Sequence, residues 1–240
     1  MKTVIHPAYQ SLATFVENLP EQFDTLGEVI YHGRNELRKI AVGDQNIVVK
    51  SFRIPHWINR IAYTFFRPSK AERSYKYALR LLEKEIPTPA PVAYIVEKRN
   101  GLIFRSFYVC EYTDYPGLLR ELDFRDLDEV RDLVTAFAHF TAFVHEQQVL
   151  HLDYSPGNIL YEQKGLLYRF CLVDLNRIRF KKVSMRAGCF NLRRLWGTDE
   201  IMTHLAEIYA QDRGFNVMKC VLLTLTYFRK FWKRRAKRTF

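Results

Sequence analysis

Two neighbouring segments constrain what this chain can be more than any other feature. The first, "HLDYSPGNIL" (residues 151–160), places His151, Asp153 and Asn158 at offsets of 0, 2 and 7. The second, "RFCLVDLNRI", follows after a short turn and carries a single carboxylate, Asp174, inside an apolar run. Each residue alone has an ordinary structural explanation, because a lone Asp often caps a turn and a lone His often packs in a core. The spacing of the four together is unusual, and its meaning depends on the rest of the chain.

The composition predicts a folded protein with a sizeable core. The 240 residues are 48% apolar and 15% aromatic, which excludes a disordered chain and allows one large domain or two lobes. The four cysteines have no metal-ligand spacing, so we expect them to be reduced core residues of a cytosolic protein. No apolar run reaches the length of a membrane span, and the first residues do not resemble a signal peptide.

The pattern of apolar residues and turn signals predicts an α+β organisation in two lobes, residues 1–112 and 113–240. The first is rich in strands, with a helix that begins near a capping pattern of Ser69 and Glu72. The second is mainly helical. The expected strands are a meander over 28–52 and segments near 92–97, 103–112, 158–162 and 168–175. The expected helices of the second lobe cover about 126–148, 188–195, 199–211 and 215–232.

In this context the two segments indicate phosphoryl transfer. That reaction needs a carboxylate near the acceptor hydroxyl and oxygen ligands for the magnesium ions that bridge the phosphates. Asp153 can supply the first, while Asn158 and Asp174 can supply the second. Upstream, "IVVKSF" places Lys50 on a strand, from which a lysine can reach the phosphates. This order of strand lysine, helix, hinge, helix, catalytic loop and metal-binding Asp is that of a protein-kinase-like fold. We expect His151 to brace the loop.

The same segments differ from those of protein kinases. Leu152 stands where protein kinases carry an arginine, "DLN" replaces D-F-G, and no A-P-E follows. Only 66 residues remain after Asp174, which leaves little room for a peptide-docking platform. A small-molecule or glycan acceptor is therefore favoured.

Four stretches together resemble the bacterial lipopolysaccharide kinases, which phosphorylate Kdo or heptose in the inner core. They are "HLDYSPGNIL", "LVDLNRIRF", "NLRRLW" and "PSKAERSYKYALRLLEKEIPTPAPVAY", and the resemblance covers about residues 28–200. It implies a bilobal kinase-like fold that uses ATP and Mg²⁺. It also implies a set of roles: Asp153 as base, Asn158 and Asp174 as metal ligands, Lys50 on the phosphates, and backbone groups around Glu111 and Tyr112 holding adenine.

Two features depart from the kinase pattern. The loop expected to cover the nucleotide, "YHGRNELRK", contains one glycine, Gly33, where protein kinases have three. The acid expected to pair with Lys50 is also displaced, because Ser74 stands where several relatives have Glu. Glu72 is the nearest carboxylate, and a capping role for it is equally compatible with the pattern.

The net charge of +11 is concentrated at the C-terminus. Nine Lys or Arg residues follow Asp212, the last acidic residue, so that the preceding chain carries a net charge of only +2. The tail is compatible with a packed helix that has a solvated basic end, with an RNA-binding patch, or with contact between residues 229–238 and an anionic membrane. The expected apolar face of this helix contains Met218, Val221, Leu222, Leu225, Phe228 and Trp232.

We favour the membrane, because it suits a glycolipid acceptor (lipid A–core), and we expect a cytoplasmic protein peripheral to the inner membrane. Nucleic acid is not the expected partner. One alternative is a compact atypical kinase that acts with tRNA-modification machinery. A second is a catalytically silent binding module. Aminoglycoside-type kinases share the loop pattern, but a basic tail has no obvious function in them.

His139, His145 and the connector around Trp57 are expected to have structural roles.

Overall fold

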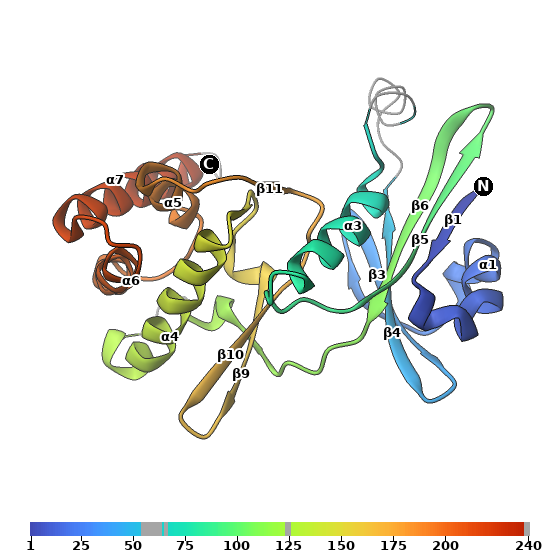
Figure 1. Ribbon diagram of the computed structural model, residues 1–240, viewed down its shortest axis with the longest axis horizontal. Helices are drawn as coiled ribbons and strands as arrows, with labels where there is room; N and C mark the ends of the chain where they lie inside the picture. The colour runs from blue at the N-terminus through green and yellow to red at the C-terminus, as the bar shows by residue number, and fades with distance from the viewer. Residues whose placement is uncertain (54–63, 65–66, 123–125, 238–240) are drawn as a thin grey trace. The chain divides into compact units, whose positions relative to one another are not determined.

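A computed structural model describes residues 1–53, 64, 67–122 and 126–237. The connector around Trp57 and the terminal cation Arg238 lie outside these residues. The chain forms two compact units, Met1–Asp114 and Tyr115–Phe240, and each is described by itself (Figure 1).

The first unit is built on an antiparallel sheet with strand order β1-β5-β6-β4-β3-β2. Its strands are β1 (Lys2–Ile5), β2 (Glu28–His32), β3 (Asn35–Val42), β4 (Gln45–Phe52), β5 (Pro91–Arg99) and β6 (Leu102–Glu111). The predicted meander over 28–52 is confirmed as β2, β3 and β4. The turn between β3 and β4 contains Gly43 with φ +58°, a left-handed conformation that glycine adopts without a steric penalty.

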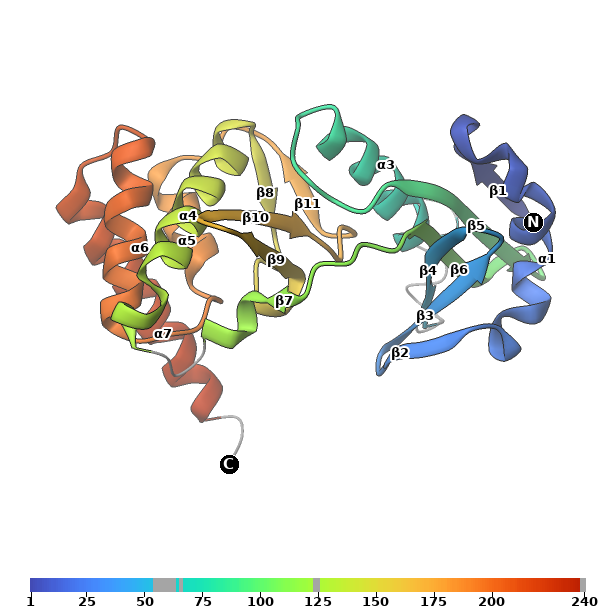
Figure 2. The same ribbon diagram turned by 90° about the horizontal axis from the view of Figure 1, so that it is seen from below.

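Helices cover both faces of this sheet (Figures 1 and 2). On one face, Val16 and Leu19 of α1 (Ala13–Gln22) join the buried core with Val49 of β4 and its neighbours. On the other, Tyr75 of α3 (Lys70–Leu82) packs its ring against Tyr94 at a centroid distance of 5.3 Å. The capping prediction for α3 is confirmed in part, because the Ser69 hydroxyl accepts from the backbone N–H of Glu72 at 3.0 Å. No element was predicted before residue 28, so β1 and α1 are additions to the expected lobe.

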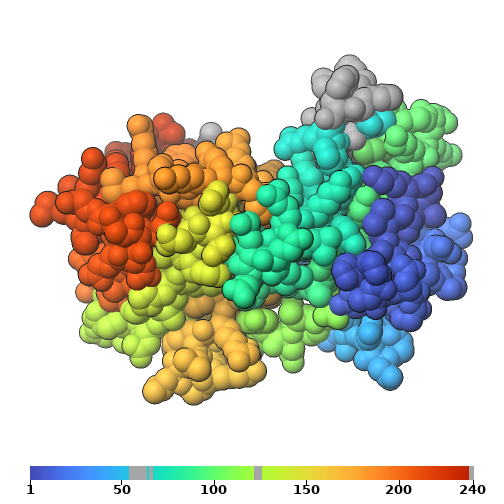
Figure 3. All heavy atoms as spheres, viewed as in Figure 1, coloured from blue at the N-terminus to red at the C-terminus, as the bar shows by residue number. Residues whose placement is uncertain are grey.

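The second unit is mainly helical and contains two small sheets. Its helices are α4 (Leu127–Glu146), α5 (Met185–Leu192), α6 (Asp199–Asp212) and α7 (Val217–Ala236), and the last three form one contiguous body (Figure 3). One sheet has the order β10-β9-β7, with β7 (Gly117–Leu118), β9 (Ile159–Lys164) and β10 (Leu167–Leu172); the other pairs β8 (Val149–His151) with β11 (Ile178–Phe180). The four helices and the β9–β10 hairpin were predicted. β7, β8 and β11 were not, because two or three residues carry no periodic signal.

The predicted apolar face of α7 is partly wrong. The buried side chains are Cys220, Thr224 and Phe228, while Met218 and Leu222 are 75% and 60% exposed. Only this narrower face of α7 is covered by its contacts with α5 and α6. Within it, Cys220 lies against Cys189, with the two Sγ atoms 3.4 Å apart. As predicted, all four cysteines are buried and reduced. No helix among the described residues is both long and apolar enough to cross a bilayer.

Candidate active site

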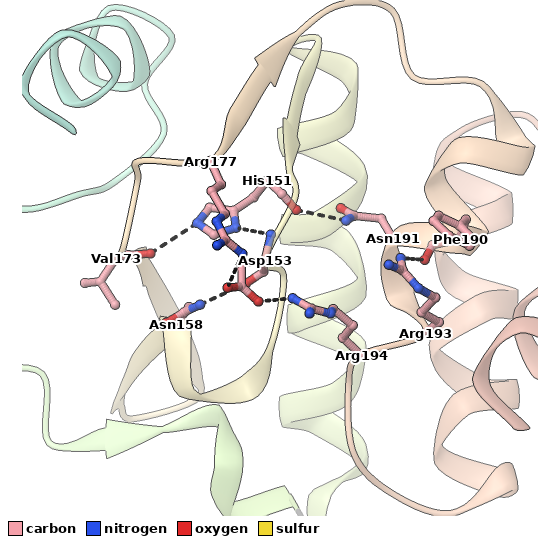
Figure 4. Close-up of polar contacts among 9 residues, drawn as sticks. All are labelled: His151, Asp153, Asn158, Val173, Arg177, Phe190, Asn191, Arg193 and Arg194. Carbon is pink, nitrogen blue, oxygen red and sulfur yellow. Dashed lines mark hydrogen bonds and ion pairs between the residues drawn. The ribbon is translucent and has the colours of Figure 1, made fainter. Parts of the chain in front are cut away.

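The loop that carries Asp153 is fixed on both sides by the residues next to it. His151, at the end of β8, accepts a hydrogen bond from the backbone N–H of Asp153 at its Nδ1 (3.2 Å), and its Nε2 lies 3.2 Å from the carbonyl oxygen of Val173 (Figure 4). The Nε2–H tautomer satisfies both contacts. Tyr154 is fully buried, with its hydroxyl 2.9 Å from that of Thr141 in α4. The expected bracing role of His151 is therefore confirmed, and the Tyr154 anchor is an addition.

A buried chain of hydrogen bonds supports this loop from three helices. Asn191 of α5 donates from Nδ2 to the carbonyl oxygen of His151 at 2.9 Å, and its Oδ1 lies 3.1 Å from Nε2 of His145. Nδ1 of His145 lies 2.9 Å from the hydroxyl of Tyr209 in α6. Burial lowers the pKa of His145 to about 4, so the ring is neutral at pH 7. Nε2–H then donates to Asn191, and Nδ1 accepts from Tyr209.

Gly188 makes the close packing of this network possible. A Cβ atom built at Gly188 would overlap the hydroxyl oxygen of Tyr209. Any larger residue at this position would displace the tyrosine from His145. The glycine in "RAGCF" therefore has a packing reason.

The backbone brings Asn158 and Asp174 together. The N–H of Val173 donates to the carbonyl oxygen of Asn158 at 3.0 Å, which places the next residue, Asp174, beside this turn. The sequence predicted that Asp174 lies at the end of its strand. β10 ends at Leu172, so Asp174 instead lies two residues beyond it. The physical reason is its φ of +57°, because a left-handed residue cannot continue a strand.

The side chains of this pair fit a magnesium ion. Asn158 donates from Nδ2 to the backbone carbonyl oxygen of Asp153 at 2.9 Å, so Oδ1 is the atom of this side chain that could bind a metal ion. Asp174 is held by Asn176, whose Nδ2 donates to Oδ1 at 2.6 Å. One amide oxygen and one carboxylate are hard ligands of the kind that Mg²⁺ takes together with phosphate oxygens and water. The described residues contain no cluster of three His, Cys, Asp or Glu that would instead favour an all-protein metal cage.

Two arginines contact the carboxylate of Asp153, and neither was predicted to do so. Nη1 of Arg194 binds Oδ1, and Nη1 of Arg177 lies 3.7 Å from Oδ2 (Figure 4). Arg194 follows α5 in "NLRRLW", and Arg177 precedes β11 in "DLNRIRF". Both stretches contributed to the family resemblance, but nothing in the local spacing indicated that they meet at this aspartate.

Lys50 and Glu72 belong to the first unit. Lys50 pairs with Leu37 and Tyr108 across β4, so strand alternation directs it to the face that α3 covers. The carboxylate of Glu72 in α3 binds Nζ of Lys76 at 2.7 Å and Nζ of Lys2 at 3.4 Å. Its pairing with Lys50 stays a prediction.

Glu111 and Tyr112 have their backbone donors engaged. The N–H of Glu111 donates to the carbonyl oxygen of Ala90, and that of Tyr112 donates to the carbonyl oxygen of Asn46, each at 2.9 Å. Adenine recognition by these two residues would therefore use their carbonyl oxygens. Oε1 of Glu111 accepts from the Tyr9 hydroxyl at 2.7 Å, and burial together with this bond raises the pKa of Tyr9 to about 12.

Gly33 lies in the turn between β2 and β3. Its N–H donates to the carbonyl oxygen of Asn35 at 3.1 Å. A Cβ atom at this position would collide with the ring of Tyr31, so the absence of a side chain makes room for the tyrosine. Tyr31 is 54% exposed and can move, so this contact alone does not require a glycine, and the nucleotide-binding role of Gly33 stays a prediction.

One sheet-rich unit and one mainly helical unit, with a loop such as that of Asp153 between a long helix and a hairpin, are the organisation of the protein-kinase-like fold. The chain has this fold. More narrowly, residues 56–213, well over half of its length, match the family model described as "Lipopolysaccharide kinase (Kdo/WaaP) family". The chain belongs to this family and is therefore a kinase.

A solved structure confirms the α+β kinase-like fold. The chain is similar to "WaaP in complex with acyl carrier protein", with a TM-score of 0.67, 17% identity and 99% of each chain covered. It also matches a kinase domain of Mycobacterium tuberculosis PknI, with a TM-score of 0.47, 14% identity and coverage of 85% of this chain and 95% of that one. No curated protein matches the sequence.

Proposed function

We propose that this kinase transfers the γ-phosphoryl group of ATP to a hydroxyl of Kdo or heptose in the inner core of lipopolysaccharide. The observation that carries the proposal is the placement of Asp153 in a loop whose backbone is held by His151, Tyr154 and Asn158. A carboxylate fixed in this way can orient a hydroxyl, since its own backbone has little freedom. A catalytically silent binding module would not need the backbone around Asp153 to be held in this way.

Asp153 is the proposed base. Its carboxylate accepts a hydrogen bond from the acceptor hydroxyl and takes the proton as the oxygen attacks the γ-phosphorus. A new P–O bond to the sugar forms while the bond to the ADP oxygen breaks. Asn158 and Asp174 hold Mg²⁺, which when bound neutralises charge on the phosphates. Lys50 contacts the phosphates, the carbonyl oxygens of Glu111 and Tyr112 contact adenine, and the turn at Gly33 covers the nucleotide.

The direct test is transfer of labelled phosphate from ATP to purified core glycolipid. Asp153→Asn keeps the shape of the side chain and removes the base, so transfer should fall by about 10²–10⁴-fold while nucleotide binding is retained. Asp44→Asn, at an exposed turn of the first unit, is the matched control and should transfer at the wild-type rate. Transfer by Asp153→Asn at the wild-type rate would contradict the base assignment.

We further propose that the basic end of α7 contacts an anionic membrane. Lys230, Lys233, Arg234 and Lys237 are exposed there, while Arg229 is bound to Asp199 of α6 at 2.6 Å. Each basic residue near an anionic surface contributes on the order of 1 kcal/mol. This end of α7 adjoins the segment that contacts Asp153, because Trp232 donates from Nε1 to the carbonyl oxygen of Leu195 at 3.1 Å. A glycolipid bound at α7 would thus be presented near the proposed base.

Because Trp232 is part of this packing, substitution is a cleaner test than deletion. Changing Lys230, Lys233, Arg234 and Lys237 to Gln should abolish co-sedimentation with vesicles that contain anionic lipid and leave ATP binding unchanged. The control changes four other exposed cations, Lys98, Arg99, Lys164 and Lys181, to Gln. Added salt should mimic the first variant, since surface attraction is screened within about 10 Å at 0.1 M.

The same assay tests two other partners. Tight tRNA binding by the wild-type protein, without vesicle binding, would contradict the membrane proposal and favour the tRNA-associated kinase. Since the similar WaaP structure contains acyl carrier protein, that protein is included as a third ligand. Its binding in place of vesicles would assign the basic end of α7 to a protein partner.

A further inference from the structure

The surroundings of Asp153 carry more positive charge than this carboxylate neutralises. Arg194 and Arg177 both contact it, and Arg235, at the end of α7, lies close enough for its charge to act on Arg194. Burial and the neighbouring charge of Arg235 lower the pKa of the Arg194 guanidinium. Two guanidinium groups on one carboxylate, with a third cation nearby, leave an excess that an anionic ligand can offset.

Arg194 is held in place while part of its guanidinium stays available. Its side chain is 28% exposed, and the guanidinium lies 5.9 Å from the ring centroid of Phe231 in α7. Within the described part of the chain, it donates through Nη1 to Asp153, and neither Nε nor Nη2 donates to another residue. A guanidinium has five N–H donors in one plane, so it can hold Asp153 with one edge and a second anion with another.

The direction from which Arg194 approaches distinguishes it from the proposed metal ligands. Figure 4 shows Arg194 reaching Asp153 from one side and Asn158 from the opposite side. Asn158 donates to the backbone of Asp153 and belongs to the proposed magnesium site, whereas Arg194 binds the carboxylate itself. A ligand on the arginine side would therefore lie next to the carboxylate and away from the proposed nucleotide metal.

We propose that Arg194 and Arg177 form a binding site for an anionic group of the acceptor, a carboxylate or phosphate carried by the sugar near the hydroxyl that is phosphorylated. Binding of this group aligns the hydroxyl with Asp153. Planar, bidentate recognition suits both carboxylate and phosphate. The inference rests on the proposed function, because it deepens the description of the acceptor in that reaction.

The test compares two acceptors and three variants. The acceptors are a core glycolipid fragment and the same fragment with its carboxylates converted to methyl esters and its phosphates removed. Arg194→Gln should raise the KM for the anionic fragment roughly tenfold or more, as expected for the loss of one charge-assisted contact, and leave the KM for ATP unchanged. Arg194→Lys should recover part of the loss. Arg193→Gln is the matched control, because the Arg193 guanidinium lies over the ring of Phe190 at 3.6 Å and does not contact Asp153.

The neutralised fragment separates recognition from positioning. It should bind wild-type protein weakly, and Arg194→Gln should not weaken it further. An equal fall in kcat for both fragments, with KM unchanged, would overturn the proposal and make Arg194 a residue that only orients Asp153. Competition by vesicles of anionic phospholipid, lost in Arg194→Gln, would assign the site to a lipid headgroup and also overturn it.

A binding measurement keeps the inference independent of turnover. Calorimetry with the anionic fragment, in the absence of ATP, should show weaker binding to Arg194→Gln than to Arg193→Gln. If wild-type protein phosphorylated neither fragment but bound the anionic one through Arg194, the proposed function would fail and the anion site would stand. Equal binding by the two variants would overturn the anion site, whatever the turnover.

Discussion

The buried His145 predicts a specific loss of stability in mild acid. Its pKa is lowered from 6.5 to about 4, because burial disfavours the charged ring. Between these two pH values the unfolded chain binds a proton at this residue and the native protein does not. Protonation therefore favours the unfolded state, and the free energy of unfolding falls as the pH falls from 6.5 toward 4. A difference of two to three pKa units corresponds to about 3 kcal/mol.

His145→Gln isolates this contribution, because Gln stays neutral and keeps a donor and an acceptor in the network. Urea unfolding of both proteins, followed by tryptophan fluorescence at several pH values from 7 to 4, gives the free energy of unfolding at each pH. The substitution itself changes the free energy of unfolding at pH 7. From pH 7 to pH 4, however, the free energy of unfolding should fall by about 3 kcal/mol more for the wild-type protein than for the variant. The contributions of the carboxylates and the other histidines cancel in the comparison. Parallel curves for the two proteins would refute the assignment of His145 as a buried neutral ring.

Three further substitutions test the site. Gly188→Ala should lower the free energy of unfolding by about 1–3 kcal/mol, because the added methyl overlaps the Tyr209 hydroxyl; an unchanged thermal midpoint would contradict this packing. Asn191→Ala leaves buried partners unsatisfied at His145 and the His151 carbonyl, at a cost of about 1–3 kcal/mol each, measured by urea unfolding. Asp174→Ala should abolish Mg²⁺-dependent use of ATP with the circular dichroism spectrum unchanged, and turnover that still responds to Mg²⁺ would contradict its role as ligand.

Local patterns predicted the parts of the fold that have a long period or a strong turn signal. The apolar spacing of residues 127–146 and the turns of the meander belong to single segments, and their structures follow from them. β1 and α1 could not be predicted in the same way, because the burial of Val16 and Leu19 depends on a sheet formed by residues far along the chain. The face of α7 was misjudged for a similar reason: its apolar residues cover more of the helix than α5 and α6 bury.

The residues of the candidate site also fall into those that local spacing predicted and those that only the folded chain brings together. Asp153 and Asn158 come from one stretch, and a short hairpin brings Asp174 beside them, so spacing alone indicated that these residues meet. Arg194 reaches Asp153 from 41 residues away, and His145 reaches Tyr209 across 64 residues. Neither pair has a local signature. The doubled arginine in "NLRRLW" was visible in the sequence, but only the packing of α5 against the loop shows which arginine contacts Asp153.

We propose that this kinase adds phosphate to a sugar of the lipopolysaccharide core. The strongest test of this reaction is mass spectrometry of lipid A–core from cells that lack the protein, complemented with the wild-type chain or with Asp153→Asn. The wild-type chain should add the mass of one phosphate, and fragmentation should place it on Kdo or heptose. Asp153→Asn, expressed to the same level, should not add it. Identical lipid A–core spectra with and without the wild-type protein would contradict the claim.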